Sequence, residues 1–141
     1  MLSEVKYNDL LELAGVDHYL DIAPKGLASH TSSNGKSTYK DRIEKHASWG
    51  GGIFEAILYG HKQPRARDVV LAWVIDDGFK SRTHRKNLFN PIHKHVSIIA
   101  GPHSSAEFCV IAMFAAQIMS KAKGAEIELK NQEKRAKEYR K

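Results

Sequence analysis

The stretch that decides the fold is HKHVSIIAGPHSSAEFCVIAMF, residues 93–114. It contains two apolar segments, His93 to Ala100 and Glu107 to Phe114, whose length and composition are typical of β-strands. The residues between them, Gly101 to Ser105, include glycine, proline and serine, which favour turns. The stretch therefore predicts an antiparallel hairpin.

Segments with helical apolar patterns lie before and after this hairpin. Helices are predicted over Lys6–Asp21, over Asp41–His46, over Ala66–Asp76 and from Ala115 onward. Ile53–Tyr59 is compatible with either a strand or the start of a buried helix. Helices before, between and after a small antiparallel sheet predict an α+β fold with α-β-α layers. The residues of the third helix that we expect to pack inward are Val69, Val70, Ala72 and Trp73.

The length and charge of the chain divide it into one domain and a tail. With 141 residues, the chain has the length of a single domain. Its formal net charge is +6, and residues 121–141 contain eight basic and four acidic side chains, hence four of those net charges. We predict a domain over residues 1–120 and a basic tail over 121–141 that is helical or partly disordered. The candidate partner-binding residues of this tail are Lys130, Lys134, Arg135, Lys137, Arg140 and Lys141.

The chain has one cysteine, Cys109, within an apolar segment. It therefore contains no intrachain disulfide, and a buried thiol is expected. The N-terminus lacks the basic and apolar regions of a secretory signal, and no apolar run approaches the ~18 residues of a membrane span. These features predict a cytoplasmic protein, or a secreted one if the chain is a processed fragment.

Four side chains able to bind a metal ion or move protons stand where segments meet: His30, Glu55, Asp76 and His84. Imidazole and carboxylate groups together suit Zn²⁺ or a similar divalent ion, and neutral imidazoles also serve as bases. The candidate metal ligands within this set are His30, Glu55 and His84. By contrast, the alternation of His93 and His95 predicts a solvated strand face rather than a metal pair.

Residues 76–91 read DDGFKSRTHRKNLFNP, and His84–Pro91 resembles the HRxN(I/L)xNP signature of the CAP superfamily, which includes cysteine-rich secretory proteins, antigen 5 and pathogenesis-related proteins. The resemblance is to the cysteine-poor bacterial and protist branch. It spans about Asp17 to Phe114, with its parts in the family's order. Upstream of Asp76, the parts that resemble the family are Asp17-His18, Gly26-Leu27, Ser29-His30, Asp41-Arg42-Ile43, Trp49-Gly50-Gly51 and Glu55.

The resemblance implies a three-layer α-β-α sandwich (an SCP-like domain) with a central cleft. Two histidines and two acids line that cleft, which binds a divalent metal in some members. Carried over by position, the histidines are His30 and His84, and the acids are Glu55 and Asp76. The helix that opens the family's domain is expected to be shortened here.

Several departures from the family pattern bear on function. Ala56 stands where the family usually has Asn, and Thr83 and Ser97 stand where it usually has Gly. These substitutions and the basic tail favour a non-enzymatic binding or assembly module within a larger complex, such as a cytoskeletal one. The protein partners of such a module are expected to have acidic surfaces. The alternatives are a metal-binding effector or hydrolase that uses the His/Glu/Asp/His cleft, and a protein that binds lipid or sterol. Nucleic-acid binding is disfavoured because no recognised motif accompanies the tail.

Overall fold

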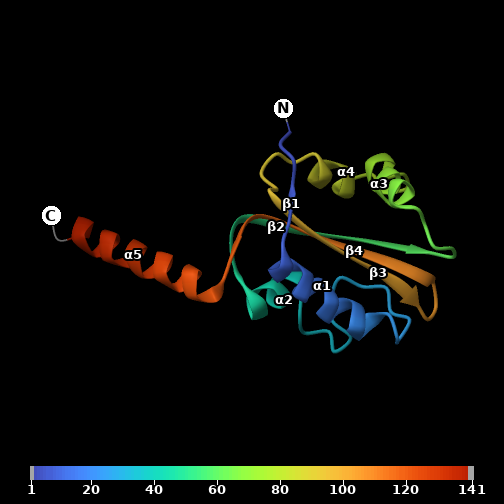
Figure 1. Cartoon of the computed structure of the whole chain (residues 1–141), viewed down its shortest axis with the longest axis horizontal. Helices are drawn as coiled ribbons and strands as arrows, with labels where there is room; N and C mark the ends of the chain where they lie inside the picture. Colours follow the sequence, from blue (N-terminus) through green and yellow to red (C-terminus); the bar gives the residue numbers. More distant parts are fainter. Residues whose placement is uncertain (1, 140–141) are drawn as a thin grey trace.

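The computed structural model describes residues 2–139, which form one mixed sheet with helices on both faces (Figure 1). The strands are β1 (Lys6–Tyr7), β2 (Ser48–Gly60), β3 (His95–His103) and β4 (Glu107–Met119), in the spatial order β1-β3-β4-β2. The helices are α1 (Asp9–Ile22), α2 (Tyr39–His46), α3 (Ala66–Ile75), α4 (Thr83–Leu88) and α5 (Lys121–Tyr139). The predicted α+β class is confirmed.

The predicted hairpin is β3 and β4, which pair antiparallel from His95 opposite Ala115 to His103 opposite Glu107. β2 pairs antiparallel with the other side of β4. The sheet is not wholly antiparallel, because β1 pairs with β3 in parallel, Lys6 opposite His95. This short strand could not be predicted, since two exposed residues carry no alternation pattern.

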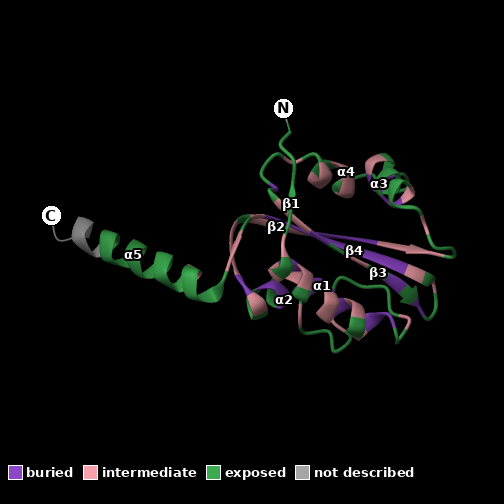
Figure 2. Cartoon of the chain, viewed as in Figure 1, coloured by how far each residue is buried: buried purple, intermediate pink, exposed green. Residues whose placement is uncertain are grey.

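Alternate side chains of β4 enter two separate cores, which explains why its sequence is apolar at nearly every position. Ile111 and Met113 belong to the core under α1 and α2. Val110, Ala112 and Phe114 belong to the core under α3. A strand buried on both faces needs apolar residues without alternation, and β4 is accordingly the most buried element in Figure 2.

The helix termini follow local capping rules. The Asn8 side chain accepts hydrogen bonds from the amides of Leu10 and Leu11 and so begins α1. Before α2, the Asp41 carboxylate accepts from the amide and the hydroxyl of Thr38. The cap at Asn8 explains why residues 6–8 do not join the helix predicted from Lys6.

Three further sequence predictions are wrong in detail. Ala115–Met119 is the end of β4, not the start of the last helix, which begins at Lys121 and passes through Gly124. On α3, Val69 and Trp73 are buried as predicted, but Val70 and Ala72 are exposed. His93 precedes β3 and is buried against the Phe114 ring at 5.8 Å, so it does not lie on a solvated face.

Candidate functional site

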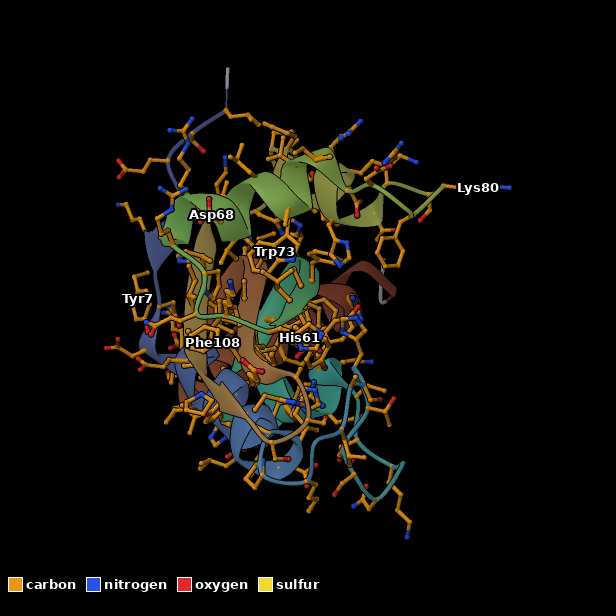
Figure 3. All side chains as sticks on the ribbon, turned by 90° about the vertical axis from the view of Figure 1, so that its right-hand side faces the viewer. Tyr7, His61, Asp68, Trp73, Lys80 and Phe108 are labelled. Carbon is orange, nitrogen blue, oxygen red and sulfur yellow. The ribbon has the colours of Figure 1, made fainter. Side chains whose placement is uncertain are left out.

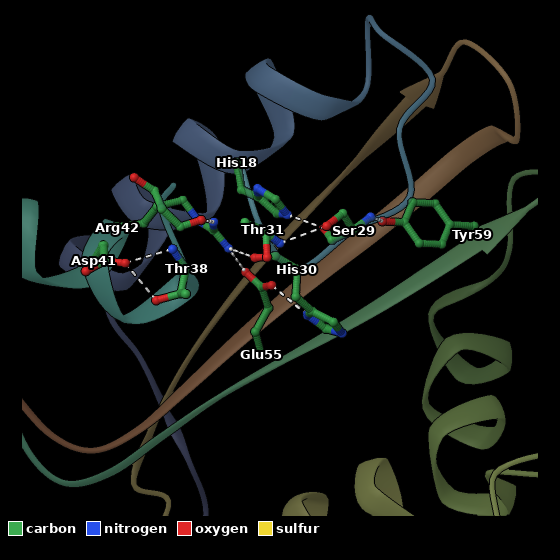
Figure 4. A network of polar contacts seen from close by, with 10 residues as sticks. His18, Ser29, His30, Thr31, Thr38, Asp41, Arg42, Glu55 and Tyr59 are labelled. Carbon is green, nitrogen blue, oxygen red and sulfur yellow. Dashed lines mark hydrogen bonds and ion pairs between the residues drawn. The ribbon is translucent and has the colours of Figure 1, made fainter. Parts of the chain in front are cut away.

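A buried carboxylate on β2 anchors the first candidate histidine. Glu55 is 1% exposed, and its Oε1 lies 2.8 Å from Nδ1 of His30 in the loop between α1 and α2 (Figure 4). Because an ionised carboxylate only accepts hydrogen bonds, the ring proton lies on Nδ1. In the neutral ring with its proton on Nδ1, Nε2 of His30 carries the free lone pair.

The second oxygen of Glu55 binds a buried arginine. Nη2 of Arg42, on α2, lies 2.7 Å from Oε2 of Glu55 and 3.1 Å from the carbonyl oxygen of His30 (Figure 4). A buried charge requires a compensating partner, and Arg42 supplies it. Both oxygens of Glu55 are thus occupied by protein donors.

A second, fully buried imidazole lies beside this pair. His18 on α1 has Nε2 2.7 Å from the carbonyl oxygen of Ser29, next to His30 in the loop. Burial lowers the pKa of His18, and the charge of Arg42 lowers it further, although the Glu55 carboxylate opposes both. His18 is therefore a neutral residue that holds the loop of His30 against α1.

The other candidate pair lies where α3 ends and α4 begins. Nδ1 of His84, on α4, lies 2.9 Å from Oδ1 of Asp76, which ends α3 in a left-handed conformation with φ of 49°. Burial alone would raise the pKa of Asp76, but hydrogen bonds from His84 and from the Arg85 amide lower it below its usual value. The neighbouring Asp77 side chain is 88% exposed, so Asp76 is the acid that orients His84.

His30 and His84 line one pocket of about 210 Å³. Phe79 closes part of it, with its ring edge-on to His84 at a centroid distance of 5.5 Å. This arrangement is consistent with the expectation that the two histidines, which are distant along the chain, line a common cleft. The remaining lining residues are Ala28, Ser29, Ile57 and Tyr59.

The four predicted residues form two His–carboxylate pairs rather than one ligand cluster. Among the side chains that the structure describes, those of residues 2–135, no group of three or more His, Cys, Asp or Glu is arranged to hold a metal ion. Glu55, named as a possible ligand from the sequence, is committed to His30 and Arg42. The imidazole nitrogens that these two pairs do not use are Nε2 of His30 and Nε2 of His84.

Sequence reasoning did not assign a role to Arg42 or His18. Both stand in the quoted motifs Asp41-Arg42-Ile43 and Asp17-His18, so the signal was present. An arginine with an aspartate before it normally indicates a solvated helix face, and only the burial of Glu55 reveals the need for a nearby cation.

The predicted partner-binding residues lie on or beyond α5, which extends away from the sheet (Figure 1). Lys130 pairs with Glu126 at 2.6 Å. The side chain of Lys137 and all of residues 140–141 lie outside the described part of the chain. The exposed basic residues of the set are Lys130, Lys134 and Arg135.

None of the helices described in residues 2–139 combines the length and apolar character needed to cross a membrane.

No family model matches the chain, and no curated protein matches it. Among solved structures, the chain is similar to an outer surface protein from Borrelia burgdorferi, with a TM-score of 0.66 and 18% sequence identity. The match covers 81% of this chain and 78% of that protein. At this identity the likeness concerns the fold: the two chains share an α+β architecture.

Proposed function

We propose that the chain is a CAP-type α-β-α domain whose central pocket binds a divalent metal ion through His30 and His84. The observation that carries the proposal is that both imidazoles line one pocket while each Nδ1 is hydrogen-bonded to a buried carboxylate. The order of the sequence motifs and helices on both faces of the sheet support the family assignment.

The two pairs supply the chemistry that a metal site requires. A metal-binding imidazole usually donates its other N–H to a carboxylate, which fixes the ring and increases its basicity. Glu55 and Asp76 are in this position behind His30 and His84. A bound Zn²⁺ would supply a Lewis acid and a water of lowered pKa. With two protein ligands, the affinity is expected to be modest.

The geometry favours binding over nucleophilic catalysis. Among the described residues, no hydroxyl group is hydrogen-bonded to either pocket imidazole. The Ser29 hydroxyl, which lies in the lining loop, accepts a hydrogen bond from the Thr31 amide. A hydroxyl nucleophile that is activated by a histidine needs a hydrogen bond to the imidazole. We therefore propose no reaction.

The test is calorimetric titration with zinc chloride near neutral pH. We expect one equivalent to bind, with at least a tenfold loss of affinity in His30→Ala and in His84→Ala. His46→Ala is the matched control, because His46 also pairs with a carboxylate, Asp17 at 2.7 Å, but does not line the pocket. An absence of zinc uptake, or an equal loss in His46→Ala, would exclude the proposal.

A second proposal is that α5 docks the domain on the acidic surface of a protein partner, as in an assembly module. Its support is that α5 is exposed throughout residues 125–135 and extends away from the sheet, free of the two cores (Figure 2). A poly-glutamate peptide is a suitable probe. We expect salt-sensitive binding that is lost when Lys130, Lys134 and Arg135 are all changed to Glu. Equal binding by this triple variant would contradict the role of α5.

A further inference from the structure

The outer side of β2 is an unpaired edge of the sheet. In the strand order β1-β3-β4-β2, β4 pairs with only one side of β2. Among the described residues, no backbone hydrogen bond joins the other side of β2 to the rest of the chain. Figure 3 shows Tyr7 of β1 at one side of the molecule and Lys80, which follows Phe79 in the loop after α3, projecting at the opposite side. We refer to the outer side of Ile57–Tyr59 as the β2 edge.

The pairing of β1 with β3 fixes the direction of the backbone groups in β4. The carbonyl oxygen of Val96 accepts a hydrogen bond from the Asn8 amide at 2.9 Å, so the backbone groups of Val96 face β1. Those of the next residue, Ser97, therefore face β4. Ser97 is opposite Met113, and hydrogen-bonded pairs alternate along an antiparallel ladder. The backbone groups of Met113 thus face β3, and those of its neighbours face β2.

The same alternation fixes the direction of the backbone groups in β2. Ala112, which follows from the previous step as a residue that faces β2, is opposite Ala56. The N–H and C=O groups of Ala56 therefore face β4, and those of Ile57 are turned away from it. By the same rule Tyr59 is also turned outward. Glu55 is turned outward too but is only 1% exposed, whereas Ile57 and Tyr59 line the pocket of about 210 Å³.

Two walls stand beside the β2 edge, one on each face of the sheet. On the face of α1 and α2, the wall is the loop between these helices, in which the Ser29 amide donates to the Tyr59 hydroxyl at 3.1 Å (Figure 4). On the face of α3, the wall is formed by Phe79 and His84. His84 contacts Phe54, whose side chain packs against the core under α3. The β2 edge is therefore the floor between two walls.

The β2 edge lacks the features that usually prevent an edge strand from pairing. Those features are lysine, proline, an inward-pointing charge or a bulge. Residues 56–60 read AILYG and contain no charge or proline, and the irregularity of β2 lies earlier, between Gly50 and Ile53. None of the described residues that line the pocket is Lys, Arg, Asp or Glu. The edge therefore suits an uncharged partner.

We infer that the β2 edge binds an extended, uncharged segment of a partner protein, which adds to the sheet as a further strand. Main-chain groups of the segment pair with the outward N–H and C=O groups of Ile57 and Tyr59, and its side chains contact the two walls. A second copy of this chain fits less well, because its own β2 carries the same two walls and all four would meet. The inference does not rest on the proposed metal site, since main-chain groups of β2 carry it.

The experiment is a titration of the ¹⁵N-labelled chain with the blocked peptide acetyl-Thr-Val-Thr-Val-Thr-amide, followed by NMR. We expect the amide protons of Ile57 and Tyr59 to shift downfield in a saturable manner and to exchange at least tenfold more slowly. The amides of Ala56 and Leu58, which face β4, should change little. Absence of a saturable shift at Ile57 and Tyr59 would overturn the inference. The titration contains EDTA, so its outcome is separate from that of the zinc titration.

The matched control is the same peptide N-methylated at two adjacent residues. In either register one methyl group faces β2 and replaces a hydrogen-bond donor, so the affinity should fall at least tenfold. Equal binding of the two peptides would show that the side chains of the peptide are recognised rather than its main chain, and would overturn the inference.

Two variants test the wall on the α3 face. Phe79→Ala should weaken peptide binding several-fold, and Phe79 is 58% exposed, so its loss leaves the core intact. Phe89→Ala is the control, because Phe89 is 50% exposed and does not line the pocket. Equal affinities of the two variants would overturn the placement of the segment.

Sedimentation velocity without peptide tests the second copy as an occupant. We expect a monomer at all concentrations. A dimer whose formation slows exchange of the Tyr59 amide would assign the β2 edge to another copy of this chain and would overturn the inference.

Discussion

Arg42 and Glu55 form an ion pair at 2.7 Å in which the side chains are 6% and 0% exposed. The pair joins α2 to β2, and the same carboxylate orients His30. The stability of the domain and the geometry of the pocket therefore depend on one buried charge.

Removal of Arg42 should be strongly destabilising. In Arg42→Met the Glu55 carboxylate loses its buried counter-charge, and we expect a loss of about 3–5 kcal/mol in the free energy of unfolding. Urea denaturation followed by circular dichroism measures it. Lys45→Met is the control, because Lys45 pairs with Asp17 at a site where it is 67% exposed, and its loss should cost under about 1 kcal/mol.

The double variant Arg42→Met with Glu55→Gln sharpens this test. Since the second change removes the uncompensated charge, it should recover part of the stability lost in Arg42→Met. A double variant as unstable as the sum of the two single variants would show that the pair is not coupled.

Stability should fall as the pH is lowered below the usual histidine pKa of 6.5. Burial lowers the pKa of both His18 and His93 in the folded protein. The unfolded chain therefore binds more protons than the folded one below pH 6.5, and acid favours unfolding until the folded pKa values are reached. Urea denaturation at about pH 7.5 and about pH 5.5 measures the difference.

His93→Leu should reduce this pH dependence and keep or increase the stability at neutral pH. Both ring nitrogens of His93 are buried without a partner among the described residues, so leucine removes an unfavourable burial. His61→Leu, at an exposed position, is the control for the loss of a histidine outside the core. A steeper pH dependence in His93→Leu would contradict the assignment.

Gly101→Ala should destabilise the contact between α1 and β3. A Cβ atom at Gly101 would lie 2.5 Å from the Tyr19 hydroxyl oxygen, which donates to the Pro102 carbonyl at 2.9 Å. We expect a loss of about 1–3 kcal/mol, measured by urea denaturation. Gly60→Ala is the matched strand control, because its Cβ would meet its nearest atom, the Lys62 carbonyl oxygen, at an ordinary 3.5 Å. Tyr19→Phe should relieve part of the cost in the Gly101→Ala background.

A chain that ends at Ser120 should retain the fold. α5 belongs to neither apolar core, and it approaches the sheet where Gly124 lies against Ser48. We expect the free energy of unfolding to change by less than about 1 kcal/mol, because the residues removed are mostly exposed. Loss of the cooperative thermal transition would show that the predicted division at residues 120–121 is wrong.

The hairpin and the first, second and third helices could be predicted from the sequence because their signals are local. Ala115–Met119 could not, since alanine, glutamine and methionine favour helix in isolation. The strand there depends on pairing with Ser48–Ile53, far away in the chain. Tertiary contacts here override the local preference of these residues for a helix.

The four residues of the candidate site could be named from their chemistry, but only the resemblance indicated that they share a cleft. His30 stands in a loop and Glu55 on β2, whereas Asp76 ends α3 and His84 lies on α4, so neither pair belongs to a single helix or strand whose periodicity could reveal it. Their approach depends on how the chain from α3 to α4 passes the loop that carries His30.

The pairing of β1 with β3 has a consequence for the order of folding. Lys6 finds its partner at His95, so β1 can join the sheet only after the ribosome has synthesised a strand that lies far along the chain. Contacts of such long range form slowly. Docking of the N-terminal segment is thus expected to be a late event that follows formation of the β3–β4 hairpin.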